Sequence, residues 1–267
     1  MAGETREAFI EIRGLHQRFG MSRVLRGVNL DVYRGETLAL LGGSGGGKSV
    51  LIKHMCGLMR PWKGTVTVDG EDITDLPERK LQEVRRKVSI MFQGGALFDS
   101  FTVAQNIAFP LREAGIRDEK EIDKRVSEAL EIVRMPGQKS KMPADLSGGM
   151  RKRVALARAV VKKPCCVLYD EPHAGLDPIT ADSIDHLIKD LEESHKITNV
   201  VITHEMRSVF RIANRIVFML DGQIYWEGEP GEMARSLDPV LKNFIEGRSE
   251  NREGWEGNAP FIDTGEE

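Results

Sequence analysis

The start of the chain alternates between apolar and polar positions. Apolar side chains recur within residues 9–12, and Val28, Leu30 and Val32 repeat with a period of two. A period of two sends successive side chains to opposite faces of a strand. The pattern predicts strands with one exposed face in this region.

Later apolar runs are continuous, which is typical of strands that are covered on both faces. These runs occupy residues 37–41, 88–92, 165–169 and 200–203. Two further runs, 216–220 and 224–226, flank Asp221-Gly222, a dipeptide that favours a hairpin turn. The run at 37–41 leads into a glycine-rich segment, so we expect a buried strand followed by a tight turn.

Helical spacing follows that turn. Leu51, Met55 and Leu58 recur on one helical face, and we expect Pro61 to close the helix. Residues 37–60 therefore predict a strand, a glycine-rich turn and a helix.

Two longer amphipathic helices are expected further along the chain. One follows Asp118, which with Glu121 has the spacing of a capping box, and the other covers about 184–191. Strands that alternate with helices predict an α/β fold with a mainly parallel sheet. Residues 93–160 lack buried-strand runs and are predicted to be a helical insertion. The last thirty residues are polar, so we expect a tail rather than part of the core.

Composition excludes several classes of protein. The chain has 267 residues, a net charge of −3, 30% charged and 40% hydrophobic residues, which suits a soluble globular protein with a real core. It excludes a disordered acidic chain and a strongly basic nucleic-acid coat. The basic group Arg151, Lys152, Arg153 and Arg158 lacks interleaved aromatic residues, so a solvated helix face is favoured and no nucleic-acid partner is expected.

The cysteines and apolar runs indicate the compartment. Cys56 stands alone and Cys165 adjoins Cys166, so the odd count favours a reducing compartment and small buried side chains. No run approaches the roughly 18 apolar residues of a membrane-spanning helix, and no signal peptide is evident. We expect a cytoplasmic protein that meets membranes through a partner or a surface.

A phosphate-binding loop is the strongest chemical signal. The pattern G-x-x-x-x-G-K-[ST] is matched by Gly42, Gly43, Ser44, Gly45, Gly46, Gly47, Lys48 and Ser49. Glycines let successive N–H groups converge on phosphate oxygens, and the following helix adds its positive end. Lys48 is expected to pair with the β- and γ-phosphates, and the Ser49 hydroxyl is expected to bind Mg²⁺.

Two carboxylates end a later buried strand. Asp170 and Glu171 follow the apolar run 165–169, where ligands bind in open parallel sheets. We expect Asp170 to hold the Mg²⁺ shell and Glu171 to polarise the attacking water.

Leu146-Ser-Gly-Gly-Met150, continued to Arg158-Ala159, resembles the signature motif and helix of ATP-binding cassette (ABC) ATPases. Ser147, Gly148 and Gly149 open a helix whose free N–H groups can meet a γ-phosphate. Other elements of this family are matched in order by Phe19 for adenine stacking, Gln93 for the Q-loop, Gly175-Leu-Asp177 for the D-loop and His204 for the H-loop. A core position for Phe19 and a purely structural role for His204 are the alternatives.

The resemblance covers about residues 8–235. It implies a P-loop NTPase fold with a RecA-like core at about 8–92 and 161–235, a helical subdomain at about 93–160, and a C-terminal tail at 236–267. It also implies a head-to-tail homodimer with ATP between the P-loop of one subunit and the signature of the other, where Asp177 joins the nucleotide site. The expected catalytic residues are Glu171, His204, Lys48 and Gln93, and the expected Mg²⁺ ligands are Ser49, Gln93 and Asp170.

Two positions depart from the family pattern. Gly43 stands where proline is frequent, which loosens the first turn of the loop but keeps every amide. His173 replaces the expected threonine beside Glu171, where it either tunes turnover or is an exposed neighbour without a role.

Three stretches resemble the Mla-type ATPases, which power lipid transport with MCE-domain proteins. They are Phe92–Phe98 with Asn106–Arg112, Tyr169–Ile179, and Leu237–Gly247. The resemblance implies the ATPase of a bacterial lipid transporter, held by two permease subunits at the cytoplasmic side of the inner membrane. An MCE-domain partner and a small regulatory subunit are further expectations. The alternatives are another cargo (an amino acid or drug), a soluble non-transport ABC protein, and a catalytically silent regulator.

Overall fold

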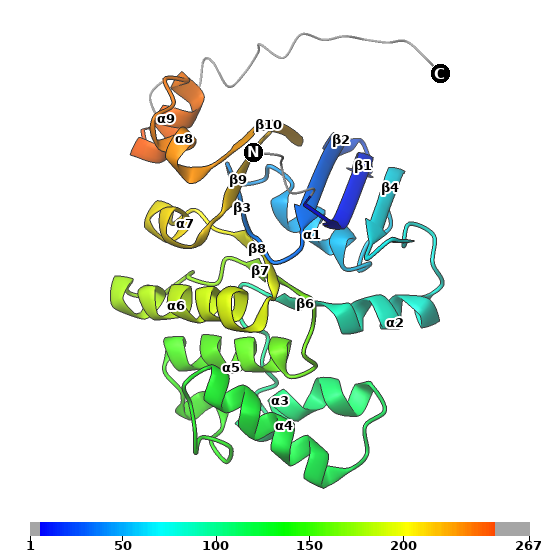
Figure 1. The fold of residues 1–267 in the computed structure, drawn as a ribbon, viewed down its shortest axis with the longest axis vertical. Helices are drawn as coiled ribbons and strands as arrows, with labels where there is room; N and C mark the ends of the chain where they lie inside the picture. The colour runs from blue at the N-terminus through cyan, green and yellow to red at the C-terminus, as the bar shows by residue number, and fades with distance from the viewer. Residues whose placement is uncertain (1–5, 249–267) are drawn as a thin grey trace.

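The computed structural model describes residues 6–248 (Figure 1). Its first sheet has the order β2-β1-β4-β5 and is antiparallel throughout. The strands are β1 (Ala8–Phe19), β2 (Ser22–Tyr33), β4 (Lys63–Val68) and β5 (Glu71–Asp72). The expected N-terminal strands are confirmed and pair antiparallel, and β4 and β5 extend the sheet beyond the prediction.

The second sheet has the order β10-β9-β3-β8-β7-β6. Its strands are β3 (Thr37–Gly42), β6 (Val88–Met91), β7 (Cys166–Asp170), β8 (Thr198–Ile202), β9 (Arg215–Leu220) and β10 (Gln223–Gly228). Neighbours pair in parallel except β9 and β10, which form the hairpin predicted at Asp221-Gly222. The carboxyl ends of β3, β7 and β8 therefore meet at one edge, which is where the functional residues gather.

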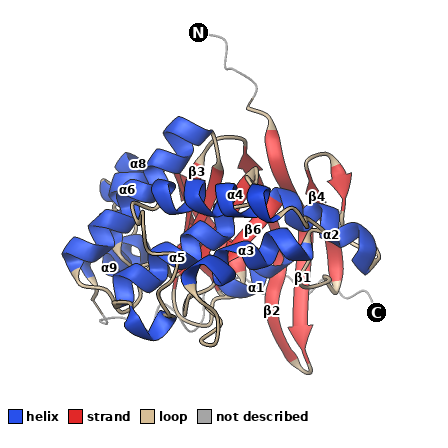
Figure 2. Ribbon diagram, turned by 90° about the horizontal axis from the view of Figure 1, so that it is seen from below, coloured by secondary structure: helices blue, strands red, loops and turns tan. Residues whose placement is uncertain are grey.

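Helices cover this framework on several sides. They are α1 (Lys48–Met55), α2 (Glu78–Lys87), α3 (Val103–Glu113), α4 (Glu119–Ile132), α5 (Gly148–Val160), α6 (Pro178–His195), α7 (Met206–Ile212), α8 (Pro230–Ala234) and α9 (Pro239–Glu246), with a 3₁₀ turn at Pro143–Asp145. Helices α3, α4 and α5 pack on one another and lie together in Figures 1 and 2. Residues 93–160 are thus helical, as predicted, while the division of the chain into domains stays a prediction.

Buried apolar side chains form three clusters. One joins α3, α4 and α5 to α6, a second fills the space between the two sheets and α1, and a third lies under α7, α8 and α9. Each fully buried Leu, Ile or Phe side chain contributes about 1.5–3 kcal/mol relative to an exposed one. The three clusters together hold the sheet edge in place.

Helix α1 ends earlier than the sequence predicts. It stops at Met55 rather than near Pro61, because Gly57 turns to a positive φ of 64° and the Leu58 N–H returns to the Lys53 carbonyl at 2.9 Å. Leu58 is consequently exposed and does not lie on the buried face of the helix.

Helix α4 begins as predicted but without the expected capping box. The Asp118 carboxylate accepts from the Lys120 N–H at 2.9 Å, while Glu121 accepts from Arg125 Nε at 2.6 Å instead of returning to the cap. A salt bridge along the helix has replaced the reciprocal bond.

The expected C-terminal tail is partly wrong. Residues 239–246 form α9, in which Leu241 is fully buried and Phe244 packs against Phe218 at a ring distance of 4.9 Å. A few apolar side chains at helical spacing anchor this otherwise polar segment to the third cluster. Trp255 and Phe261 lie outside the described residues.

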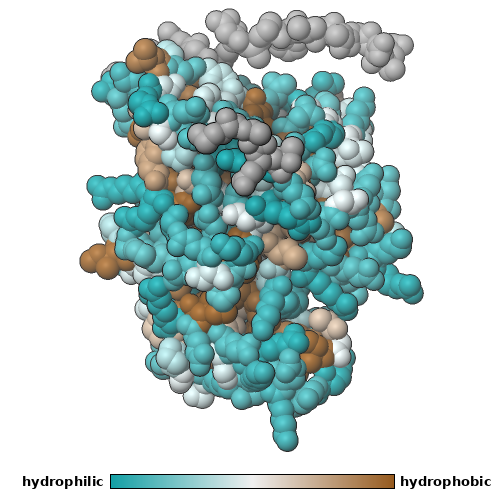
Figure 3. All heavy atoms as spheres, in the orientation of Figure 1, coloured by the Kyte–Doolittle hydropathy of each residue, from teal (hydrophilic) through white to brown (hydrophobic). Residues whose placement is uncertain are grey.

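The surface in Figure 3 is mostly hydrophilic, with scattered apolar patches. Within residues 6–248, none of the helices combines the length and apolar character needed to cross a bilayer. The cysteine prediction holds for Cys56 and Cys166, which are buried, and is wrong for Cys165, which is exposed at the start of a strand.

Candidate functional site

The glycine-rich loop connects β3 to α1 in a conformation that requires glycine at its ends. Gly42 has φ +136°, and a Cβ there would lie 2.2 Å from the Met219 carbonyl oxygen. Gly47 has φ +90° where α1 begins, and a Cβ there would lie 2.7 Å from Leu25 Cδ2. A side chain at either position forces the neighbouring backbone or side chain to move. The loop therefore presents bare backbone at the start of a helix.

Lys48 closes the loop on itself. Its ammonium group donates to the carbonyl oxygens of Gly42 at 2.8 Å and Gly43 at 2.7 Å. Burial lowers the pKa of Lys48, and the nearby carboxylates of Glu171 and Asp170 counteract part of that effect. Because the Lys48 ammonium group is hydrogen-bonded to neutral carbonyl oxygens, it can exchange these partners for charged phosphate oxygens.

Ser49 and Asp170 come together from distant parts of the chain. Ser49 Oγ donates to Asp170 Oδ1 at 3.0 Å, which joins the first turn of α1 to the end of β7. A hydroxyl and a carboxylate are the oxygen donors that Mg²⁺ prefers, and Mg²⁺ usually keeps water and phosphate oxygens as its other ligands. Within residues 6–248, no cluster of three or more His, Cys, Asp or Glu side chains forms a complete cage for a metal. The pair fits an ion that phosphates help to bind.

Glu171 and His204 face each other at the same sheet edge. Glu171 Oε2 lies 2.9 Å from His204 Nδ1, and this buried oxygen has no other partner. Glu171 adopts a positive φ of 51°, which is uncommon for a residue with a side chain, and its N–H donates to the Ile202 carbonyl at 2.9 Å. The His204 side chain is 74% exposed. The pair combines a mostly buried carboxylate, 16% exposed, with an exposed imidazole.

Gln93 is exposed in the turn after β6 and is tied to the site by its backbone. Lys152 on α5 donates to the carbonyl oxygens of Gln93 and Glu171, the latter at 3.3 Å. The hydrogen bonds of the described residues do not join the Gln93 side chain to Ser49 or Asp170. Its place in a metal shell stays a prediction.

Lys152 is a residue that the sequence analysis missed. It is only 7% exposed, and burial lowers the pKa of its ammonium group. The prediction of a solvated basic face on α5 is therefore wrong for Lys152, and Arg153 and Arg158 are half-buried and donate to backbone carbonyls. It is correct for Arg151, which is exposed. The sequence contained one signal for its burial, namely the position of Lys152 among the apolar residues on the buried face of α5.

The signature residues and the D-loop begin two adjacent helices. Ser147 caps α5 by accepting from the Met150 N–H at 3.3 Å, and Asp177 caps α6 by accepting from the Thr180 N–H at 3.0 Å. The Thr180 hydroxyl also donates to Asp177, which lowers the pKa of that carboxyl. A Cβ on Gly149 would lie 2.3 Å from Thr180 Cγ2, so the glycine permits close packing of the two helix starts.

The two groups of nucleotide-binding candidates lie in separate hollows. Ser147 and Gly149 line one with residues 134–138 and 179–183. The loop residues Gly43, Ser44, Gly45 and Gly46 line another with residues 22–26 and 219–222. In the described part of one chain, the signature and the loop thus line two different pockets.

The exposure of Phe19 and that of His173 each exclude one of the interpretations given for these residues above. Phe19 ends β1 and is 50% exposed, which excludes a core position and leaves a ring face available for stacking. His173 is 6% exposed and packs toward Asp185, so it is not an exposed neighbour of Glu171.

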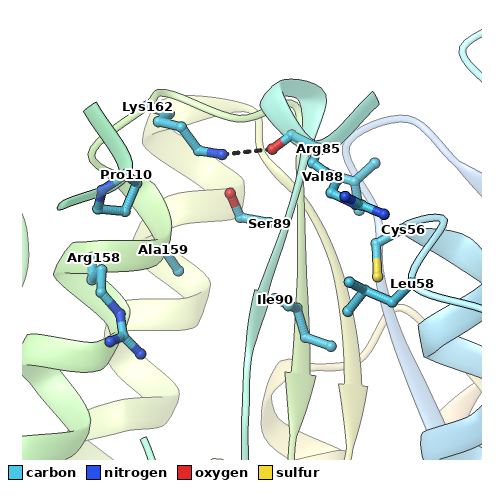
Figure 4. A pocket seen from close by; sticks show the side chains of 10 residues that line it. All are labelled: Cys56, Leu58, Arg85, Val88, Ser89, Ile90, Pro110, Arg158, Ala159 and Lys162. Atoms are coloured by element: carbon cyan, nitrogen blue, oxygen red, sulfur yellow. Dashed lines mark hydrogen bonds between the residues drawn. The ribbon is translucent and has the colours of Figure 1, made fainter. Parts of the chain in front are cut away.

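A pocket with a mixed apolar and basic lining lies between α5 and β6 and includes no residue of the loop (Figure 4). Arg85, Arg158 and Lys162 line it, and Lys162 Nζ donates to the Arg85 carbonyl at 2.6 Å. Ser89 points into the pocket, and its buried hydroxyl oxygen has no hydrogen-bond partner. The pocket is cationic and contains unused hydrogen-bonding capacity.

Comparisons with known proteins agree with this arrangement. Residues 25–174 match the family model described as ABC transporter. The chain is 39% identical over 239 residues to the probable ribonucleotide transport ATP-binding protein mkl of Mycobacterium leprae, covering 90% of this chain and 69% of that relative. It is 40% identical to the methionine import ATP-binding protein MetN of Brucella abortus, covering 91% of this chain and 66% of that relative.

Solved structures give the same result for the fold. The dimeric structure of MJ0796, a bacterial ABC transporter cassette, matches with a TM-score of 0.77 and 31% identity, over 83% of this chain and 98% of the other. The cbiO1 protein of Clostridium perfringens, part of the ABC transporter complex cbiONQ, matches with a TM-score of 0.79 and 30% identity, over 89% and 94% of the two chains.

Proposed function

Because this chain belongs to the family of ABC transporter ATPases, we propose that it is the ATP-hydrolysing subunit of a bacterial lipid transporter that works with an MCE-domain protein. The observation that supports the hydrolytic role is the convergence of Lys48, Ser49, Asp170, Glu171 and His204 at one sheet edge. The lipid cargo rests on the resemblance of residues 92–112 and 169–179 to the Mla-type ATPases.

Each converging residue receives one role. The amides of the loop and Lys48 bind the phosphates of ATP, and Phe19 stacks on adenine. Ser49 and Asp170 hold Mg²⁺, which neutralises charge on the phosphates when bound, and Gln93 joins that shell. Glu171 polarises the attacking water, and His204 meets the γ-phosphate beside it.

The site is completed by a second copy of this chain. The signature residues Ser147, Gly148 and Gly149 start α5 in a hollow separate from the loop, so they are free to meet a nucleotide held by a partner. A related cassette, MJ0796, has a dimeric structure. In the proposed head-to-tail homodimer each nucleotide lies between the loop of one subunit and the signature of the other, with Asp177 at the same interface.

The permease contact is placed at residues 93–112 and the adjoining pocket. Phe98, Phe101 and Phe109 form an aromatic cluster there, with ring centroids 4.9–6.4 Å apart, and Phe98 is largely exposed. The cationic pocket of Figure 4 includes Pro110 from the same segment. Two permease subunits docked here hold the ATPase at the cytoplasmic side of the inner membrane, and a small regulatory subunit is a further proposed partner.

Another cargo is the second candidate. The relatives mkl and MetN are named for ribonucleotide transport and methionine import. An importer of such small molecules uses the same ATPase site, so the cargo must be distinguished by the partners and the stimulating substrate.

The decisive experiment is purification of the tagged chain from its native membrane, followed by reconstitution of the captured complex. Co-purification of a permease with an MCE-domain protein, and ATP hydrolysis that responds to phospholipid but not to ribonucleotide or methionine, supports the proposal. A complex with a binding protein for small molecules contradicts the lipid assignment. Lys48→Ala in the same complex should lose ATP binding, and unchanged ATP affinity would contradict the role of the loop.

A further inference from the structure

His173 joins three elements behind the hydrolytic residues. It follows Glu171-Pro172 and is almost fully buried between Asp185 of α6 and Thr203 at the end of β8. His173 Nε2 lies at an ion-pair distance of 2.7 Å from Asp185 Oδ1, and neither atom has a hydrogen-bond partner among the described residues. The imidazole is therefore held by this one contact on its Nε2 side.

The other ring nitrogen of His173 contacts the loop that carries His204. His173 Nδ1 is 3.4 Å from Thr203 Oγ1, and that hydroxyl oxygen accepts from the Glu205 N–H at 3.1 Å. With the ring hydrogen on Nε2 toward Asp185, Nδ1 is an acceptor for the Thr203 hydroxyl. A continuous path thus runs from α6 through His173 to both neighbours of His204.

Asp185 is itself fixed from a third element. Arg211 of α7 lies 3.5 Å from Asp185 Oδ2 and also pairs with Asp182. A buried carboxylate without partners is strongly destabilising, so the contacts of Asp185 with Arg211 and His173 both stabilise its position. Helix α7 begins directly after the His204 loop, and α6 begins at the D-loop residue Asp177.

We propose that His173 is a positioning residue that holds the His204 loop against Glu171 through the path Asp185–His173–Thr203–Glu205. The inference rests on the roles proposed above for Glu171 and His204. A threonine at this position carries its only polar atom one bond from Cβ, whereas the imidazole carries nitrogens on two sides. The histidine is therefore able to connect α6 to the His204 loop, and it transmits the position of the D-loop helix to the hydrolytic residues.

The test measures kcat and KM for ATP in His173 variants of the full chain. His173→Phe keeps an aromatic ring, slightly larger than the imidazole, and removes both nitrogens, so kcat should fall by about 10- to 100-fold through misplacement of His204, while KM and nucleotide affinity stay unchanged. His173→Gln supplies a donor and an acceptor, so it should restore most of kcat. The double variant with Asp185→Asn should be no slower than His173→Phe alone, because both changes break one path.

Three outcomes overturn the inference. The first is an unchanged kcat in folded His173→Phe. The second is an equal loss of kcat in the Gln and Phe variants. The third is a lower Tm in which kcat and KM change together, as expected of a purely structural role. If His173→Phe does not fold, Thr203→Val decides, since it removes the hydroxyl at nearly constant volume and should lower kcat in the same way; an unchanged kcat there overturns the proposal.

Glu171→Gln in the same assay separates this inference from the proposed function. If Glu171→Gln still hydrolyses ATP, Glu171 is not the residue that polarises the attacking water, and the proposed function on which this inference rests is contradicted. An inactive Glu171→Gln beside a fully active His173→Phe contradicts the positioning role alone.

Discussion

Ser49 Oγ donates to Asp170 Oδ1 at 3.0 Å across 121 positions of sequence. The contact exists because the parallel pairing of β3, β8 and β7 brings the carboxyl ends of these strands to one edge. It joins the start of α1 to the end of β7, so the hydroxyl and the carboxylate are placed for one cation.

Ser49→Ala should raise the Mg²⁺ concentration that gives half-maximal ATP hydrolysis by at least about tenfold, because one of the three proposed protein ligands is lost. A Mg²⁺ titration of phosphate release measures this. Ser127→Ala is the matched control, since Ser127 lies on α4 and its hydroxyl donates to the Asp123 carbonyl. Identical Mg²⁺ dependence in Ser49→Ala and the unmodified chain contradicts the metal role.

Glu171→Gln should lower ATP hydrolysis about 10²–10⁴-fold, equivalent to about 3–5 kcal/mol in the barrier, while ATP still binds. The amide keeps the size of the side chain and loses the charge that faces water and His204. Single-turnover phosphate release and equilibrium nucleotide binding together test this. Glu193→Gln, at the exposed end of α6, should behave as the unmodified chain.

Lys152→Met should lower kcat by about tenfold or more with ATP affinity preserved, because the carbonyls of Gln93 and Glu171 lose the cation that joins them. The control is Lys163→Met, which removes an exposed ammonium paired with Glu128. If both variants hydrolyse ATP equally fast, Lys152 has no part in holding the site.

Leu241→Ala should cost about 2–5 kcal/mol in the free energy of unfolding, since a fully buried side chain of α9 is removed from the third cluster. Leu237→Ala is the comparison: this leucine is 90% exposed, so its loss should change stability by less than about 0.5 kcal/mol. Urea unfolding of both variants measures the difference. Equal stabilities mean that α9 is not part of the cooperative fold.

The thiols should differ in reactivity. Burial raises the pKa of Cys56 to about 11 and raises that of Cys166 as well, whereas Cys165 is exposed. A raised pKa means less thiolate at a given pH, so at pH 8 iodoacetamide should label Cys165 first, and Cys56 should react only as the pH approaches 11. Peptide mass spectrometry of the native protein after timed labelling reports the order.

Most of the fold was predictable from local pattern. The continuous apolar runs identify the parallel strands, and Asp221-Gly222 identifies the hairpin, because burial on both faces and turn chemistry leave local signals. Strands β4 and β5 and helix α2 were not predicted. The early end of α1 has a local signal that the prediction did not use, because Gly57 ends the helix with a positive φ.

The candidate site was also predictable only in part. The loop residues and the carboxylates Asp170 and Glu171 follow from motif and position, since a strand end followed by glycine or acid has a direct chemical meaning. The burial of Lys152 had only one signal in the sequence, its place among the apolar positions of α5. The pairing of His173 with Asp185 could not be predicted, because it depends on elements that only the folded chain brings together.

The missing side chain at Gly149 has a mechanical consequence. Since Thr180 Cγ2 occupies the place of a Cβ there, the first turns of α5 and α6 are in direct contact. The signature and the D-loop are separate motifs in the sequence, but their helices are packed so closely that we expect them to move together. We therefore expect a displacement of either helix start to push on the other through this steric contact.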